Sequence, residues 1–119
     1  MSKPREKLPT AAAARMFAAL GDETRLSLVK KLGRGAPLSA TELAAGADIT
    51  RQAVSKHLDV LEAAGLVSSA REGRAVLYSL EGKRLESAQR YLEQVSAAWD
   101  GALERLKALI EVGVGDDEP

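Results

Sequence analysis

The 119 residues of this chain suffice for one domain with a modest core, and they are too few for two domains of ordinary size. Hydrophobic residues make up 45% of the chain and aromatic residues only 3%, so the core must consist of Leu, Val and Ala side chains, which suit packed helices. The absence of cysteine excludes disulfides and thiolate metal sites, and the single histidine excludes a histidine-rich metal site within one chain.

The zero net charge hides an uneven distribution along the chain. Residues 1–34 hold eight basic and three acidic side chains, whereas residues 85–119 hold three basic and eight acidic ones. The N-terminus lacks the apolar stretch of a signal peptide, and no window approaches the roughly 18 apolar residues that a membrane span needs. We therefore expect a cytoplasmic protein.

The first elements are a basic arm and two helices. Residues 1–9 contain three basic residues and two prolines, which predicts a flexible arm. A helix is expected from about residue 10 to residue 20, with its apolar side chains at steps of three and four residues. These side chains are Ala13, Met16, Phe17 and Leu20. A second helix should run from Asp22, a good N-cap, to about residue 32. Its buried stripe is expected to consist of Leu26, Val29 and Leu32.

Two further helices have the spacing of a helix-turn-helix. Ser39 and Glu42 form a candidate capping box, in which each side chain satisfies a backbone amide, so a short helix should begin there and end near Gly46. The next helix should begin at Thr50 as N-cap and end at Ala64, with Gly65 as its left-handed cap. Its expected buried stripe is Val54, Leu58 and Leu61. Two short helices joined by a turn with glycine are typical of a helix-turn-helix.

The hydrophobic periodicity changes after residue 65. Residues 66–71 and 74–80 are strand-like and flank Glu72-Gly73, which predicts a β-hairpin with a two-residue turn. A hairpin directly after a helix-turn-helix is a wing. The sequence therefore predicts a mainly α fold with a small β-hairpin, a winged helix-turn-helix.

A seven-residue apolar repeat marks the segment from about 82 to 112, which we expect to form one long helix. A chain this small cannot cover such a seam by itself, so we expect a homodimer. The predicted interface residues on this helix are Leu85, Leu92, Val95, Trp99, Leu103 and Leu106. Residues 10–112 are therefore predicted to form one domain that contains the winged helix-turn-helix and the dimerisation helix, and residues 113–119 are predicted to be an acidic disordered tail.

The exposed face of the helix after Thr50 suits DNA recognition. Arginine can pair with guanine and glutamine with adenine through two hydrogen bonds, while hydroxyl and lysine side chains can hold phosphates. The wing adds an arginine on either side of its turn, where it can contact phosphates or the minor groove. The predicted DNA-binding residues are Thr50, Arg51, Gln52, Ser55, Lys56, Arg71 and Arg74. His57 is expected to pack and hydrogen-bond locally rather than bind a metal.

Four short motifs follow one another along the chain. They are Leu-Gly-Asp-Glu-Thr-Arg at 20–25, Thr-Glu-Leu-Ala at 41–44, Ser-Lys-His-Leu at 55–58 and Arg-Glu-Gly-Arg at 71–74. Together they resemble the ArsR/SmtB family of bacterial winged-helix repressors, over roughly residues 12–110. The resemblance implies the element order α-α-α-α-β-β-α and a dimer formed by the first and last helices. It therefore adds Met16 and Phe17 of the first helix to the predicted interface. It also implies that residues 50–56 lie on the recognition helix and that Arg71 and Arg74 lie on the wing.

The resemblance further implies where metal sites of the family would lie, and this sequence lacks their ligands. Where thiolate sensors carry cysteines, the chain has Ser39, Thr41 and Ala44. At the site on the long helix it has Gly82, Arg84, Val95 and Ala98. We therefore expect no metal and no cofactor. The pair Trp99-Asp100, followed by Leu103 and Leu106, is similar to a metal-free branch of the family.

Three other functions remain as alternatives to a repressor that binds an imperfect palindrome. An enzyme is disfavoured because the chain has no cysteine nucleophile, no ordered Ser/His/Asp grouping and no glycine-rich phosphate loop. A winged-helix module for protein binding would use the same apolar seam and would bind DNA weakly and without salt dependence. A sensor could use a non-standard metal site at 116–118, a small ligand beside Tyr91 and Trp99, or a protein effector. The operator and the inducing signal are not given by the sequence.

Overall fold

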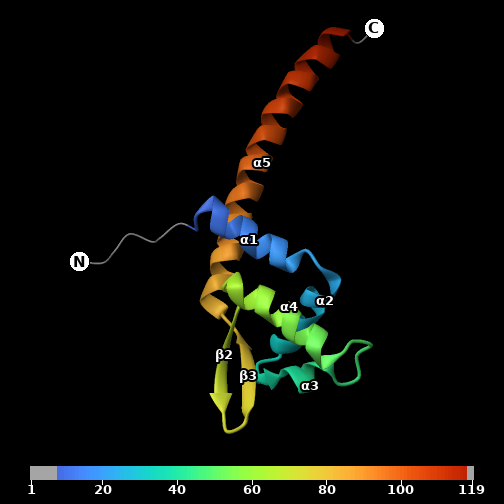
Figure 1. The fold of residues 1–119 in the computed structure, drawn as a ribbon. Helices are drawn as coiled ribbons and strands as arrows, with labels where there is room; N and C mark the ends of the chain where they lie inside the picture. Colours follow the sequence, from blue (N-terminus) through green and yellow to red (C-terminus); the bar gives the residue numbers. More distant parts are fainter. Residues whose placement is uncertain (1–7, 118–119) are drawn as a thin grey trace, which may run out of the picture. The chain divides into compact units, whose positions relative to one another are not determined.

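The computed structural model describes the backbone of residues 8–117 and the side chains of residues 8–111 (Figure 1). The helices are α1 (Thr10–Leu20), α2 (Glu23–Leu32), α3 (Ala40–Ala44), α4 (Arg51–Ala63) and α5 (Gly82–Asp117). The strands are β1 (Leu38–Ser39), β2 (Val67–Glu72) and β3 (Ala75–Leu80). The chain divides into two compact units, residues up to 88 and residues from 89 onwards. Four helices, a hairpin and a last long helix occur in the predicted order, which confirms a winged helix-turn-helix.

The ends of the predicted domain fall close to the ends of the helices. Helix α1 begins at Thr10, as expected, and residues 1–7 of the predicted arm lie outside the described residues. Helix α5 continues to Asp117, five residues beyond the predicted end at 112, because a glycine costs a helix only about 1 kcal/mol relative to alanine. Residues 118–119 of the predicted tail lie outside the described residues. None of the helices in the described part of the chain has the length and apolarity needed to cross a membrane.

The core of the first unit is built around α4. Its predicted stripe is confirmed, since Val54, Leu58 and Leu61 are all 0% exposed. The neighbouring elements contribute buried residues of the same cluster, which include Met16, Leu28, Leu32, Leu43, Leu66 and Val67. The predicted stripe of α2 is partly wrong. Leu28 is buried beside Leu32, whereas Leu26 is 47% exposed. This rotation of α2 turns Arg25 inward, where its guanidinium hydrogen-bonds the Ala19 carbonyl oxygen.

All three predicted N-caps are confirmed. The carboxylate of Asp22 accepts a hydrogen bond from the Arg25 amide at 3.0 Å, and the Thr50 hydroxyl accepts one from the Ala53 amide at 3.1 Å. Ser39 and Glu42 form both halves of the capping box, with distances of 3.1 and 2.9 Å. Gly65, which follows α4, has the predicted left-handed conformation with φ of 79°. Local sequence signals therefore fix where α2, α3 and α4 begin.

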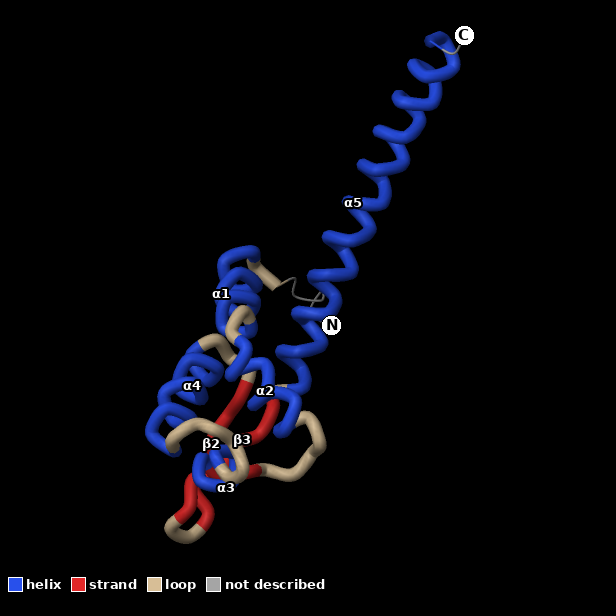
Figure 2. The backbone as a smooth tube through the Cα atoms, turned by 90° about the vertical axis from the view of Figure 1, so that its right-hand side faces the viewer, coloured by secondary structure: helices blue, strands red, loops and turns tan. Residues whose placement is uncertain are grey.

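The small sheet has three antiparallel strands in the order β1-β3-β2. Figure 2 draws the strands in red and labels β2 and β3 of the wing. Strand β1 is not predicted by the sequence, because two residues are too few to show a strand period. Its pairing of Leu38 with Tyr78 ties the start of α3 to the wing. Glu72 pairs with Ala75, so the turn is Gly73-Arg74, one residue later than predicted. Gly73 has φ of 64°, a value that glycine adopts at little cost.

Truncation of the α4 core tests this packing. Leu58→Ala should lower the free energy of unfolding by about 2–5 kcal/mol, because it removes a fully buried side chain and leaves a cavity. Val60→Ala on the same helix is the control, since Val60 is 42% exposed and should cost much less. Chemical denaturation at one fixed protein concentration measures both. Equal losses for the two variants would contradict the described orientation of α4.

Candidate nucleic-acid interface

Helix α4 presents the predicted DNA-binding side chains opposite its buried stripe. Arg51, Gln52 and Lys56 are exposed, and Ser55 is half-buried. Thr50 is exposed at the N-cap, where its oxygen holds the Ala53 amide. The first turn of α4 has no acidic residue, so nothing there opposes the positive end of the helix dipole. The first half of α4 is therefore an electropositive surface with base-pairing donors.

A groove of about 320 Å³ joins α4 to α3 and the wing. It brings together three predicted residues, Arg51, Ser55 and Arg74. Its other lining residues are Ser39, Ala40, Thr41, Ala75, Val76 and Tyr78. Because two guanidinium groups and several hydroxyl groups line it without any carboxylate, the groove suits a phosphate or the acceptor edge of a base.

The remaining predicted residues border this groove without lining it. Gln52 and Lys56 are one helical turn apart on the adjoining stripe of α4. Arg71 lies directly across the hairpin from Val76, and residues opposite each other share a face of the sheet. Arg71 is therefore on the same face of the wing as Val76 and Tyr78, which line the groove. Arg74 lies in the turn itself and is exposed.

Sequence reasoning missed Ser39, Thr41 and Tyr78 as groove residues. The capping box correctly placed Ser39 at the start of α3, but only the unpredicted pairing of β1 with β3 brings that start beside the wing. The sequence pattern places Tyr78 in a strand but does not indicate that it lines a groove. Its pKa is raised by burial and, to a smaller extent, by the charges of Asp59 and Glu62. Near neutral pH its phenol is therefore protonated and can donate a hydrogen bond in the groove.

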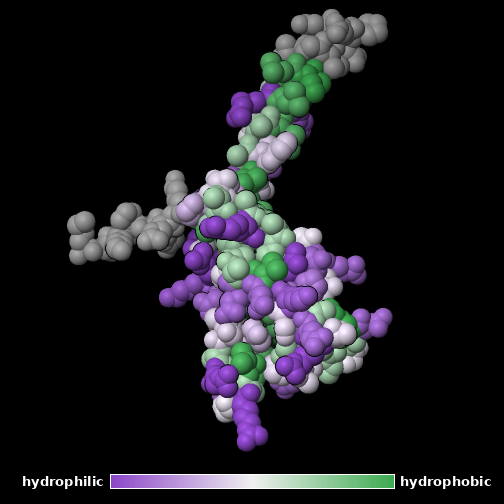
Figure 3. Space-filling model, in the orientation of Figure 1, coloured by the Kyte–Doolittle hydropathy of each residue, from purple (hydrophilic) through white to green (hydrophobic). Residues whose placement is uncertain are grey.

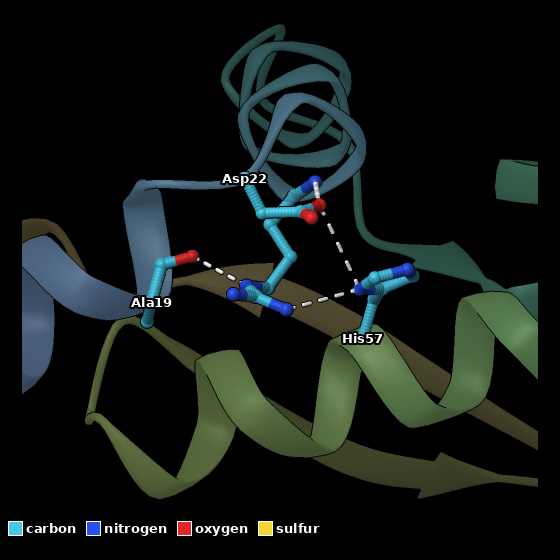
Figure 4. Close-up of polar contacts among 4 residues, drawn as sticks. Ala19, Asp22 and His57 are labelled. Atoms are coloured by element: carbon cyan, nitrogen blue, oxygen red, sulfur yellow. Dashed lines mark hydrogen bonds and ion pairs between the residues drawn. The ribbon is translucent and has the colours of Figure 1, made fainter.

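A polar network fastens α4 to α1 and α2 (Figure 4). The Arg25 guanidinium donates through Nε to the Ala19 carbonyl oxygen and contacts His57 Nδ1 through Nη1 at 3.2 Å. Asp22 Oδ2 lies 3.9 Å from the same His57 nitrogen. Arginine has only donors, so a hydrogen bond between the two groups needs the lone pair of His57 Nδ1. His57 thus hydrogen-bonds locally, as predicted, and belongs to the support of the recognition helix.

The predicted dimer residues fall into three groups by burial. Met16 is 0% exposed and belongs to the core of the protomer. Phe17 and Leu85 are half-buried and pack against the same core. The others lie on the second unit and are between 38% and 63% exposed; they are Leu92, Val95, Trp99, Leu103 and Leu106.

No group of three or more His, Cys, Asp and Glu side chains is placed to hold a metal ion in the described part of the chain. The acidic residues at 116–118, considered above for a non-standard site, lie beyond the side chains that the structure describes.

An exposed, basic recognition helix anchored in the core and flanked by a hairpin with an arginine at its turn defines a winged helix-turn-helix DNA-binding protein. The comparisons with known proteins agree. A family model described as a helix-turn-helix domain matches residues 20–70. The HTH-type transcriptional regulator Rv2034 of Mycobacterium tuberculosis is 37% identical over 87% of this chain and 92% of its own length.

Two solved structures extend this likeness to the fold. An ArsR-like transcriptional regulator from Rhodococcus sp. RHA1 is 43% identical, with a TM-score of 0.73 over 83% of this chain and 92% of that chain. The homodimeric winged helix-turn-helix DNA-binding domain Mb0332 of Mycobacterium bovis is 27% identical, with a TM-score of 0.59 over 80% of this chain and 84% of that chain. The chain belongs to the ArsR/SmtB family and is a DNA-binding transcriptional regulator. The family consists of transcriptional regulators, which are not enzymes.

The charge of Asp22 gives a pH dependence that can be measured. Its pKa lies below the ordinary 3.8, mainly because it accepts the Arg25 amide hydrogen bond, with smaller contributions from the charges of Arg25 and His57. A lowered pKa in the folded state means that the stabilisation is present above pH 3.8 and is lost as the pH falls through the folded-state pKa.

Asp22→Asn keeps the N-cap but removes the charge, so it isolates this effect. Wild type should exceed Asp22→Asn in stability at neutral pH, and the difference should shrink on acidification below the ordinary pKa of the carboxyl group. Urea denaturation over a pH series measures it. A difference that is constant with pH would show that the charge of Asp22 contributes nothing.

Proposed function

We propose that this regulator is a sequence-specific repressor that binds an imperfect palindrome as a homodimer, in the cytoplasm, where the bacterial chromosome lies. The observation that carries the proposal is the groove in which Arg51 and Ser55 of α4 meet Arg74 of the wing. Arg74 lies 19 residues after Ser55 in the sequence, and none of the three residues belongs to the hydrophobic core. In this groove all three side chains can contact the same DNA strand.

Two kinds of DNA contact follow from the placement of the side chains. Arg51 and Gln52 stand at the start of α4, the end of a recognition helix that reaches base edges in the major groove. Arg74 and Lys56, together with the hydroxyls of Ser39 and Thr41, are suited to the phosphate backbone. In this arrangement base contacts set the sequence preference and phosphate contacts set the register.

The homodimer is proposed from the apolar face of α5. Trp99 is 63% exposed and Leu106 is 52% exposed in one protomer, and apolar surface of this extent on a single helix favours association. A second copy brings the same heptad seam, so the interface is self-complementary. Two-fold symmetry then places two recognition helices in successive major grooves about 34 Å apart, which requires a palindromic site. A dimer bound across a promoter excludes polymerase.

Arg51→Ala tests base recognition. If Arg51 pairs with a guanine, the variant should lose about 1–3 kcal/mol of specific binding and should tolerate replacement of that base pair. Arg34→Ala is the matched control, because Arg34 is exposed and does not line the groove. Fluorescence anisotropy with operator and scrambled duplexes, between about 50 and 200 mM salt, measures both. Binding that does not weaken with salt would favour the protein-interaction alternative.

A pair of neighbouring substitutions on α5 tests the dimer. Leu106→Glu places a charge in the proposed seam and should shift the protein towards monomer, because a buried unpaired carboxylate costs several kcal/mol. Lys107→Glu introduces the same side chain one position away, outside the heptad seam, and should leave the dimer intact. Analytical ultracentrifugation at micromolar concentration measures the mass of each. A monomeric wild type, or two variants that behave alike, would contradict the proposed interface.

A further inference from the structure

A second cavity lies on the other side of α4, between α1, the start of α2 and the last turns of α4. Its volume is about 360 Å³, within the range of about 300–1,000 Å³ that is usual for small-molecule sites. The lining residues are Arg15, Ala18, Ala19, Arg25, Val60, Ala63 and Ala64. It shares no residue with the groove that is proposed to bind DNA.

The cavity exists because small side chains face each other across two helices. Four of its seven lining residues are alanines, two from α1 and two from the end of α4. A larger side chain in place of an exposed alanine, Ala18 or Ala63, would fill the cavity. Val60 adds an apolar wall and is 42% exposed. Figure 3 shows hydrophobic surface over α1 and α4 with hydrophilic side chains around it. The site therefore offers a small apolar body an open hollow that covers part of its surface.

Its charged groups have one sign. Arg15 and Arg25 line the cavity, and no acidic side chain does. Arg25 is held in place by its bonds to Ala19 and His57, which use two of the five donors of its guanidinium. Arg15 is exposed on α1. A carboxylate is the natural partner of such a pair, because it accepts bidentate hydrogen bonds from a guanidinium.

We propose that the α1–α4 cavity binds a small amphipathic organic anion, with an apolar body against the alanines and Val60 and a carboxylate at Arg15 and Arg25. The two arginines select against a neutral or cationic molecule. The bound ligand contacts the back of the recognition helix and the arginine that fastens it. Ligand binding at this site does not depend on which DNA sequence is recognised, so the two proposals can be tested separately.

Titration of the full-length, ¹⁵N-labelled protein with sodium decanoate, below its micelle concentration, tests the site by NMR. Decyltrimethylammonium, with the same chain length and the opposite charge, is titrated in parallel. Decanoate should shift the amide signals of residues 18–19 and 60–64 in a saturable way, with one site per protomer, and decyltrimethylammonium should not. Ala63→Leu should abolish these shifts by filling the cavity.

Two arginine variants separate a specific site from general adsorption. Arg15→Gln should weaken decanoate binding by about 3- to 10-fold through loss of one charged partner, whereas Arg34→Gln, which removes an exposed charge outside the cavity, should leave it unchanged. Because Arg15 is exposed, its substitution should not disturb folding. Shifts confined to α5, equal binding of the cationic probe or equal effects of the two arginine variants would overturn the proposal. So would unshifted signals at 18–19 and 60–64, the result expected if the second protomer covers the cavity.

Discussion

The burial of one stripe of α4 is the constraint on which the rest of the structure depends. Val54, Leu58 and Leu61 are fully buried, and burying such side chains stabilises a fold by roughly 1.5–3 kcal/mol each. A helix repeats every 3.6 residues, so fixing this stripe also fixes the opposite one. Turning α4 by a single residue position, about 100°, would bring the aliphatic side chains into water and carry Arg51 towards the core. The orientation of the proposed DNA-reading face is therefore a consequence of core packing.

The polar network of Arg25 adds a second, directional restraint. A half-buried guanidinium must have its donors satisfied, and the Ala19 carbonyl and His57 supply two acceptors from different helices. Apolar contacts tolerate small sliding of one helix past another, whereas hydrogen bonds require particular atoms to meet. The network thus fixes the axial position of α4 as well as its rotation.

Local signals predicted much of the fold, and contacts across long sequence distances account for what was missed. The N-caps Asp22, Ser39 and Thr50 and the stripe of α4 depend on residues three or four apart, and all were predictable. Strand β1 forms only because it pairs with β3, which is distant in the sequence, so no local sequence pattern predicts it. The rotation of α2 depends on the hydrogen-bond partners of Arg25, which are Ala19 on α1 and His57 on α4. For the same reason the sequence identified Arg51 and Arg74 as candidates but could not bring them into one groove or add Tyr78.

Helix α4 thereby has three surfaces with separate roles: the buried stripe, the exposed basic face and the end formed by Val60, Ala63 and Ala64. A ligand in the cavity at that end can alter DNA binding only if its affinity differs between two arrangements of α4. Arg25 is where such a difference can arise, because the guanidinium that lines the cavity is also the one that contacts His57. A carboxylate that draws the guanidinium towards the cavity weakens the hold on His57 while the apolar stripe stays buried. Recognition could then be adjusted through the polar restraint alone, without unfolding the core that orients the helix.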